Sequence, residues 1–220
     1  MDFTKRKDLV FLVLAGFFIT NAIVAELIGG KVVEFFGLFK QSVGIILWPV
    51  VFLLTDLINE HYGKQGVRKL TYITVGLIAY MFIVLSISLK IPTIEGSPVD
   101  DKSFVTVFGQ GQWIIVGSIT AFLISQLVDV SVFWMLRKRT GNKHIWLRAT
   151  GSTVVSQLLD TFVVQFIAFV IPGKWTLEEF SHNAIWGYLF KLFVALCLIP
   201  MIYVGHFIIN KFLHDSKPSN

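Results

Sequence analysis

The feature that most constrains this chain is a series of long apolar segments separated by short polar links. Six segments of about 20 residues or more can be drawn, namely 9–28, 43–62, 67–89, 113–136, 147–171 and 183–213. A helix of about 20 apolar residues spans the hydrocarbon core of a bilayer, which is about 30 Å thick. Lipid offers no hydrogen-bond partners to an exposed backbone, so such segments must be helical. The sequence therefore predicts an all-α integral membrane fold with six transmembrane helices, forming a single domain over residues 1–220.

Composition agrees with a membrane protein. Hydrophobic residues make up 55% of the chain and charged residues only 15%, whereas about a quarter of the residues in soluble domains are charged. The net charge is +5, but the basic residues gather in the short links, as they do beside a bilayer. We therefore expect the lipid bilayer as a partner and no nucleic acid.

The distribution of Lys and Arg predicts the orientation. The N-terminus, the links after the second and fourth apolar segments, and the C-terminal tail together hold thirteen of these residues, whereas the alternate links hold five. By the positive-inside rule, both termini are expected in the cytoplasm. No small-residue cleavage site follows the first apolar segment, so we expect it to be a retained helix of a multi-pass inner-membrane protein.

Several polar side chains interrupt the apolar segments. Asp56 and Glu60 are four residues apart and share one helix face with Asn59. Charged groups in hydrocarbon are costly, and by default they mark a functional interior site. Further polar candidates in the apolar segments are Asn21, Glu26, Gln126, Asp129, Gln157, Asp160 and Lys191.

One short element occurs twice. Ser-Gln-Leu-Val-Asp at residues 125–129 recurs as Ser-Gln-Leu-Leu-Asp at 156–160. The fourth and fifth predicted helices run in opposite directions, so the two copies would be related by inverted orientation, as in many transporters. The pattern is modest evidence for a duplicated unit.

Counting along the helices ranks these groups by depth. At about 1.5 Å per residue, Asp56 and Asp129 lie about 12 Å from the inner basic residues, and Gln157, Asp160 and Asn21 lie about 13, 18 and 21 Å from them. Four helices thus offer polar groups near the middle of the bilayer, which predicts a solute cavity between them.

The other candidates fall nearer the two faces. Glu60 is only about 6 Å from the inner face, while Glu26 and Lys191 are near the outer boundary.

The polar side chains in the apolar segments can also be explained without a ligand. Glu26 and Lys191 could form an outer ion pair, and Asp56 or Glu60 could pair with Arg68 or Lys69 across the inner link. Gln126 and Gln157 could be interhelical hydrogen bonds. The tryptophans near helix ends, Trp48 and Trp134 among them, are expected to be interfacial anchors.

Metal and disulfide chemistry have no support in the sequence. Cys197 is the single cysteine, so no intrachain disulfide can form. Metal-binding motifs of the Cys-x-x-Cys or His-Glu-x-x-His type do not occur. We therefore expect no metal and no cofactor.

The stretch Thr-Asp-Leu-Ile-Asn-Glu-His-Tyr-Gly-Lys at residues 55–64 resembles the signature of the queuosine precursor transporter family, which belongs to the vitamin uptake transporters. Both Ser-Gln-x-x-Asp elements and Arg148 match that family's pattern as well, and the resemblance extends from Asn21 to about His206. It implies an importer of 7-cyano-7-deazaguanine or 7-aminomethyl-7-deazaguanine. It also implies a fold similar to the substrate-binding subunits of energy-coupling-factor importers.

Such a ligand suits the polar residues. A 7-deazaguanine presents two adjacent N–H donors, which a carboxylate can accept together, and one carbonyl, to which an amide can donate. We predict that Asp129 or Asp160 binds the donor edge, with help from Gln126 and Gln157. The inner wall or gate would then consist of Asp56, Asn59 and Glu60.

Two other functions compete with this prediction. A substrate-binding subunit that depends on an ATPase module would typically carry an Ala-x-x-x-Ala face on its first helix, but Ile19 follows Ala15 and Glu26 follows Ala22 at that spacing. A membrane-embedded enzyme using an Asp pair lacks a metal cluster or nucleophile at matching depth. A homodimer is possible on Gly-containing faces, although no Gly-x-x-x-Gly pair lies in a helix.

Overall fold

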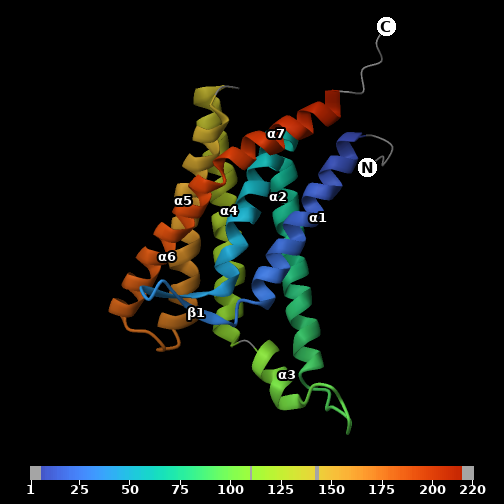
Figure 1. Cartoon of the computed structure of the whole chain (residues 1–220), viewed down its shortest axis with the longest axis vertical. Helices are drawn as coiled ribbons and strands as arrows, with labels where there is room; N and C mark the ends of the chain where they lie inside the picture. Colours follow the sequence, from blue (N-terminus) through green and yellow to red (C-terminus); the bar gives the residue numbers. More distant parts are fainter. Residues whose placement is uncertain (1–5, 110, 142–143, 215–220) are drawn as a thin grey trace.

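The computed structural model describes residues 6–109, 111–141 and 144–214. Its long helices are α1 (Arg6–Leu27), α2 (Trp48–Ser88), α4 (Gln112–Thr140), α5 (Ile145–Gln165), α6 (Leu177–Cys197) and α7 (Ile199–His214) (Figure 1). The shorter elements are β1 (Val32–Phe35), β2 (Phe39–Ser42), the 3-10 helix η1 (Val43–Ile46), α3 (Asp101–Phe108) and the π-helix η2 (Phe166–Val170).

Among the described residues, four segments are long and apolar enough to cross a membrane, namely Arg6–Leu27, Val43–Ser88, Asp101–Thr140 and Ile145–Val170. The pair Leu177–Cys197 and Ile199–Leu213, bent by 43°, makes a fifth if it is counted as one span. The prediction of an all-α integral membrane fold is confirmed.

The predicted helices 43–62 and 67–89 are the two limbs of α2. They meet at Gly63, whose φ of 77° is a conformation that glycine adopts without steric cost. Figure 1 shows α2 folding back on itself, so that its start near β1 and its end near α3 lie at the same end of the molecule. A straight helix of 41 residues would be about 60 Å long, about twice the hydrocarbon thickness. The turn at Gly63 therefore lets both limbs fit in the bilayer.

The last predicted helix, 183–213, is wrong as a continuous element. The helix begins earlier, at Leu177, where Thr176 and Glu179 form a capping box. It breaks between α6 and α7, where Pro200 cannot donate a backbone hydrogen bond to the preceding turn. The chain thus changes direction inside the hydrophobic segment.

Two links are more structured than the sequence indicates. Residues 31–42, one of the links between predicted helices, contain an antiparallel hairpin in which Val32 pairs with Ser42 and Phe35 with Phe39. This hairpin is fixed to α6, because Asn183 accepts from the Lys40 backbone and the Gln41 side chain donates to the Asn183 carbonyl. The longest polar link holds α3, whose N-cap is Asp100. Hydrogen bonds from Ser103 lower the pKa of the Asp100 carboxyl.

The long helices pack in the order α1, α2, α4, α5, α6, and α7 lies across α1, α2 and α5. Arg6 at the start of α1 donates to the Phe212 carbonyl near the end of α7, so these two ends lie together (Figure 1). Large apolar side chains face outward, and those more than 60% exposed include Phe17, Tyr80, Phe193 and Phe207. The charged residues buried inside include Glu26, Asp56, Asp129, Arg148, Asp160 and Lys191. An apolar surface around a polar interior is what a lipid-embedded solute site requires.

Candidate substrate site

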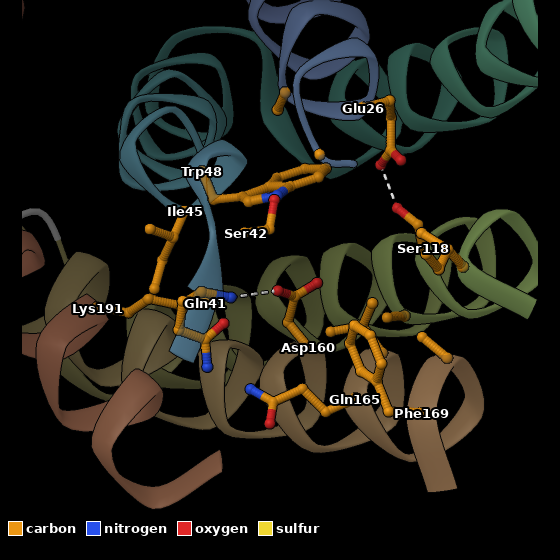
Figure 2. A pocket seen from close by; sticks show the side chains of 16 residues that line it. Glu26, Gln41, Ser42, Ile45, Trp48, Ser118, Asp160, Gln165, Phe169 and Lys191 are labelled. Atoms are coloured by element: carbon orange, nitrogen blue, oxygen red, sulfur yellow. Dashed lines mark hydrogen bonds and ion pairs between the residues drawn. The ribbon is translucent and has the colours of Figure 1, made fainter. Parts of the chain in front are cut away.

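A cavity of about 80 Å³ lies between α1, η1, α4, α5 and α6, beside the β-hairpin (Figure 2). Its polar lining consists of Glu26, Gln41, Ser42, Ser118, Asp160, Gln165 and Lys191. The aromatic side chains on its wall are Trp48 and Phe169. A concave site with an apolar wall and a few converging polar groups is the usual form of a small-molecule site.

Asp160 and Lys191 form the charged centre of this wall. Lys191 Nζ on α6 lies 2.7 Å from Asp160 Oδ2 on α5, and both side chains are about 5% exposed. The Ser125 hydroxyl of α4 lies 3.3 Å from Asp160 Oδ1, to which it donates. Two opposite charges that neutralise each other can be buried together, whereas either one alone would be costly. The carboxylate of Asp160 is therefore held in a fixed position at the edge of the cavity.

Glu26 faces the same cavity from α1. It is 4% exposed and accepts a short hydrogen bond from the Ser118 hydroxyl of α4. Depth counting separated Glu26 and Lys191, near the outer boundary, from Asp160 near the middle. The structure instead brings all three residues to one cavity (Figure 2), and Lys191 forms its ion pair with Asp160. Depth counting assumed straight helices perpendicular to the bilayer, whereas the α6–α7 segment is bent by 43°.

Gln165, which the sequence analysis missed, lies at the end of α5, directly before η2. It is 2% exposed, and neither its Nε2 nor its Oε1 has a hydrogen-bond partner among the described residues. π-helical turns are rare and are often found at functional sites. An amide buried at a cavity with donor and acceptor both unused is prepared to bind a polar ligand. A complete list of polar residues inside the apolar segments would have included it.

The aromatic residues of the cavity come from two sides. The Trp48 indole lies against Phe122, with ring centroids 5.4 Å apart, and Figure 2 shows it across the cavity from Asp160 and Gln165. Phe169 is stacked on Trp175 at 4.1 Å. Trp48 was expected to be an interfacial anchor, but η1 and the start of α2 direct it inward. The sequence shows only that Trp48 lies near a helix end, and this does not indicate whether its side chain faces lipid or the cavity.

Except for Asn21, the remaining predicted residues form a second polar cluster between α2, α4 and α5, and they do not line the cavity. Glu60 Oε2 is 2.7 Å from Arg148 Nη2 and 3.6 Å from Arg137 Nη1. The ion partners of Glu60 therefore come from α4 and α5. The expected alternative, a pair with Arg68 or Lys69 in the turn after Gly63, is not what the structure shows.

Amide and hydroxyl contacts join the helices of this cluster. Thr55 Oγ1 lies 3.1 Å from Gln126 Oε1, and Trp134 Nε1 donates to Asn59 Oδ1 at 3.3 Å. Gln126 thus forms a hydrogen bond between α2 and α4, as expected if its role is to hold helices together. Gln157 is fully buried, and its amide has no partner among the described residues.

Asn21 lies apart from both groups. Its Nδ2 donates to the Phe17 carbonyl of its own helix at 2.8 Å. Although Asn21 is predicted to lie near the middle of the bilayer, it does not line the cavity.

The two repeated elements connect the two polar groups. Ser125 donates to Asp160, and Ser156 donates to Asp129 Oδ1 at 2.9 Å, so the serine of each copy binds the aspartate of the other. The predicted inverted relation is visible in this reciprocal pairing between antiparallel helices. Asp160 points to the cavity with Lys191, and Asp129 points to the second cluster. Within the described residues, no three His, Cys, Asp or Glu side chains are grouped so that they could hold a metal ion.

Comparisons of the sequence with known proteins show which family this chain belongs to. Residues 42–205 match a family model described as "Putative vitamin uptake transporter". A Bacillus subtilis protein named "Probable queuosine precursor transporter" is 33% identical over 177 residues, covering 80% of this chain and 75% of the relative. The chain belongs to this transporter family. The match to the family model includes every predicted site residue except Asn21 and Glu26.

Other members of the family show similar coverage. A Haemophilus influenzae protein with the same name is 30% identical, covering 75% of this chain and 68% of the relative. The "Queuosine precursor transporter" of Escherichia coli is 27% identical, covering 83% and 80%. No solved structure matches the chain, so the likeness to substrate-binding subunits of energy-coupling-factor importers stays a prediction. Membership in a transporter family implies a multi-pass membrane protein with a small-molecule substrate.

Proposed function

We propose that this protein imports a queuosine precursor, 7-cyano-7-deazaguanine or 7-aminomethyl-7-deazaguanine, across the inner membrane without altering it. The observation that carries this proposal is the unused amide of Gln165 beside the Asp160 carboxylate in an aromatic-walled cavity. Two relatives of at least 30% identity are named as queuosine precursor transporters, which supports the choice of substrate.

The chemistry of a 7-deazaguanine fits these groups. Gln165 Nε2 would donate to the ring carbonyl, and its Oε1 would accept from the adjacent ring N–H. The exocyclic amino group would then donate to the carboxylate of Asp160 or Glu26. Trp48, on the opposite wall, offers an indole face on which the base can stack. Asp129 and Gln157, which the sequence analysis predicted as binding residues, do not line the cavity and would not contact the base directly.

Charge favours one of the two precursors. The cavity holds the carboxylates of Glu26 and Asp160 and the single ammonium of Lys191, a formal charge of −1 when all three are ionised. An aminomethyl group is a primary ammonium at neutral pH, whereas a cyano group is uncharged. Desolvated opposite charges attract strongly in a low-dielectric site. We therefore expect the aminomethyl precursor to bind more tightly, and Glu26→Gln to reduce that preference.

The alternative of a subunit that requires an ATPase module receives less support. Ala15, Ala22 and Ala25 of α1 are buried inside the bundle, and the exposed part of this helix carries Phe17 and other large apolar side chains. These three alanines of α1 are thus not available for docking another protein. We propose a self-sufficient carrier, with both termini cytoplasmic because most basic links lie on that side.

The decisive experiment combines binding and uptake. The purified protein is titrated with a panel of deazapurines, purines and vitamins, and uptake is measured in liposomes that contain this protein alone. We expect selective binding of a 7-deazaguanine and its recovery inside the liposomes chemically unchanged. Asp160→Asn should abolish binding, whereas Glu178→Gln, at an exposed position of α6, should not. Tight binding of a vitamin only, uptake only with an added ATPase module, or a modified product would each contradict the proposal.

A further inference from the structure

A second, smaller cavity lies beside Asp56, between α2, α5 and the break between α6 and α7. Its volume is about 20 Å³, and its lining includes Asp56, Thr150, Thr153, Leu198 and Ile202. A cavity of this size holds one water molecule when polar partners are present. Asp56 Oδ1 and Thr150 Oγ1 are two such partners, since both are buried without a hydrogen bond to any described residue.

Asp56 has a second carboxylate as its neighbour. Asp129 of α4 is fully buried, and its Oδ2 also has no hydrogen-bond partner in the described part of the chain. The Ser152 hydroxyl of α5 lies next to both carboxyl groups. The two aspartates therefore form a close pair around one serine, a pair that the substrate cavity does not include.

The charges around this pair do not neutralise it. Glu60 of α2 and Arg148 of α5 are the other charged groups that act on Asp56, and they bind each other at 2.7 Å. Among the described residues, neither Asp56 nor Asp129 makes an ion pair. The α6 and α7 residues at the cavity are apolar. Two unpaired carboxylates inside a membrane protein repel each other and each loses several kcal/mol of hydration, so they cannot both stay ionised.

We propose that Asp56 and Asp129 bind one proton and release it in each transport cycle, so that import of the precursor is coupled to a proton gradient. The proton adds to a carboxylate oxygen from water in the small cavity, which forms a neutral carboxylic acid, and it leaves to water when the cavity opens to the other side. No oxidant or co-reactant is required. The inference rests on the proposed import function, which it extends to the driving force.

The repeated elements supply a path from this proton site to the substrate. Ser156 binds Asp129 at the proton site, and Ser125 binds Asp160 at the substrate cavity, across the same pair of helices. A shift of α4 along α5 would change both hydrogen bonds together. A change of protonation at one end that moves α4 along α5 would therefore also change the substrate contacts at the other end.

The test uses the full-length protein in liposomes with a pH-sensitive dye inside. With an acidic outer solution, we expect the 7-deazaguanine precursor to accumulate above its outer concentration, with acidification of the lumen that depends on the precursor. A protonophore should abolish the accumulation, and Asp56→Asn should abolish it as well. Glu95→Gln, which changes an exposed carboxylate in the link before α3, should leave it intact.

Each outcome decides one question. Precursor uptake that proceeds without proton movement, or that a sodium gradient drives instead, overturns the proton site and leaves the import function standing. Failure to bind or move the precursor at all would overturn the import function itself. If Asp56→Asn does not fold, Thr150→Val is the second variant, and we expect it to slow proton movement. The dye signal of the unmodified protein decides whether protons move with the precursor, and the variants decide whether Asp56 belongs to the proton site.

Discussion

Asp129 and Asp160 occupy the same place in a repeated five-residue element, yet the structure gives them different surroundings. Asp160 is paired with Lys191 at 2.7 Å and lies on a cavity of about 80 Å³. Asp129 is fully buried, makes no ion pair with a described residue and lies near Asp56. The difference comes from a third helix in each case, since α6 brings a lysine to one aspartate and α2 brings a carboxylate to the other. Two nearly identical local sequences thus acquire different roles from their packing partners.

Replacing the two aspartates separately gives the largest expected contrast. Asp160→Asn leaves Lys191 buried without its counter-ion, and removing one partner of a buried pair costs about 3–5 kcal/mol of unfolding free energy. Asp129→Asn breaks no ion pair and should cost no stability. Denaturant unfolding in detergent measures both variants. Equal losses would show that the two sites are not distinct.

A double variant then separates stability from binding. Asp160→Asn combined with Lys191→Met removes both buried charges, so stability should return while precursor binding stays lost. Recovery of binding in the double variant would remove Asp160 from the substrate site.

The next largest effect concerns the arginines of the second cluster. Arg148 is fully buried and bonded to Glu60, so Arg148→Met should destabilise the protein by about 3 kcal/mol or more. Arg137 is 22% exposed and 3.6 Å from the same carboxylate, and its replacement by Met should cost less than about 1 kcal/mol. Thermal unfolding of the two variants compares them directly. A larger loss for Arg137 would mean that Arg148 is not the main partner of Glu60.

A smaller effect is expected from two buried glutamines with unused amides. Gln165→Leu should weaken precursor binding about tenfold, or about 1.4 kcal/mol, because it removes contacts at the cavity. It should not reduce stability, since an unsatisfied buried amide is itself unfavourable. Gln157→Leu, away from the cavity, should leave precursor binding nearly unchanged. Calorimetric titration of the precursor distinguishes the two variants. If both weaken precursor binding equally, Gln157 belongs to the substrate site.

The smallest effect tests the packing of α4 against α5, the two helices that carry the repeated elements. A Cβ at Gly117 would lie 3.1 Å from the Val164 carbonyl oxygen on α5, so Gly117→Ala should cost about 1 kcal/mol by forcing α4 and α5 apart. Gly16→Ala is the control, because a Cβ there meets nothing within 4 Å. Unfolding of both variants gives the difference. A stable Gly117→Ala protein would show that the α4–α5 contact is loose.

Much of the fold followed from the sequence because the bilayer restricts the possibilities. Apolar length alone predicted the helices, and the signature at 55–64 indicated the family. The break at Pro200 and the hairpin at 32–42 were missed, because both depend on packing that a count of apolar residues does not contain. The gap between the predicted helices 43–62 and 67–89 is the turn at Gly63 between the two limbs of α2.

The site was predicted less completely than the fold. Buried carboxylates and Lys191 were found because ionisable groups in apolar segments are conspicuous. Which of them share a cavity depends on helix tilt, rotation and the 43° bend, so depth counting did not predict that Glu26 and Lys191 share a cavity with Asp160. Trp48, Gln41 and Gln165 were missed as site residues because their types are ordinary near helix ends and hairpins. These three residues line the cavity only because the fold brings them next to residues that are distant in the sequence.

The reciprocal serine–aspartate bonds also affect how the protein enters the membrane during synthesis. A carboxylate at the middle of a single helix raises its insertion free energy by about 2.5–3.5 kcal/mol. α4 and α5 each carry one such aspartate, and the short link between Thr140 and Ile145 keeps them adjacent. Each helix supplies the hydroxyl that the other needs, so the two are expected to leave the translocon as one hairpin.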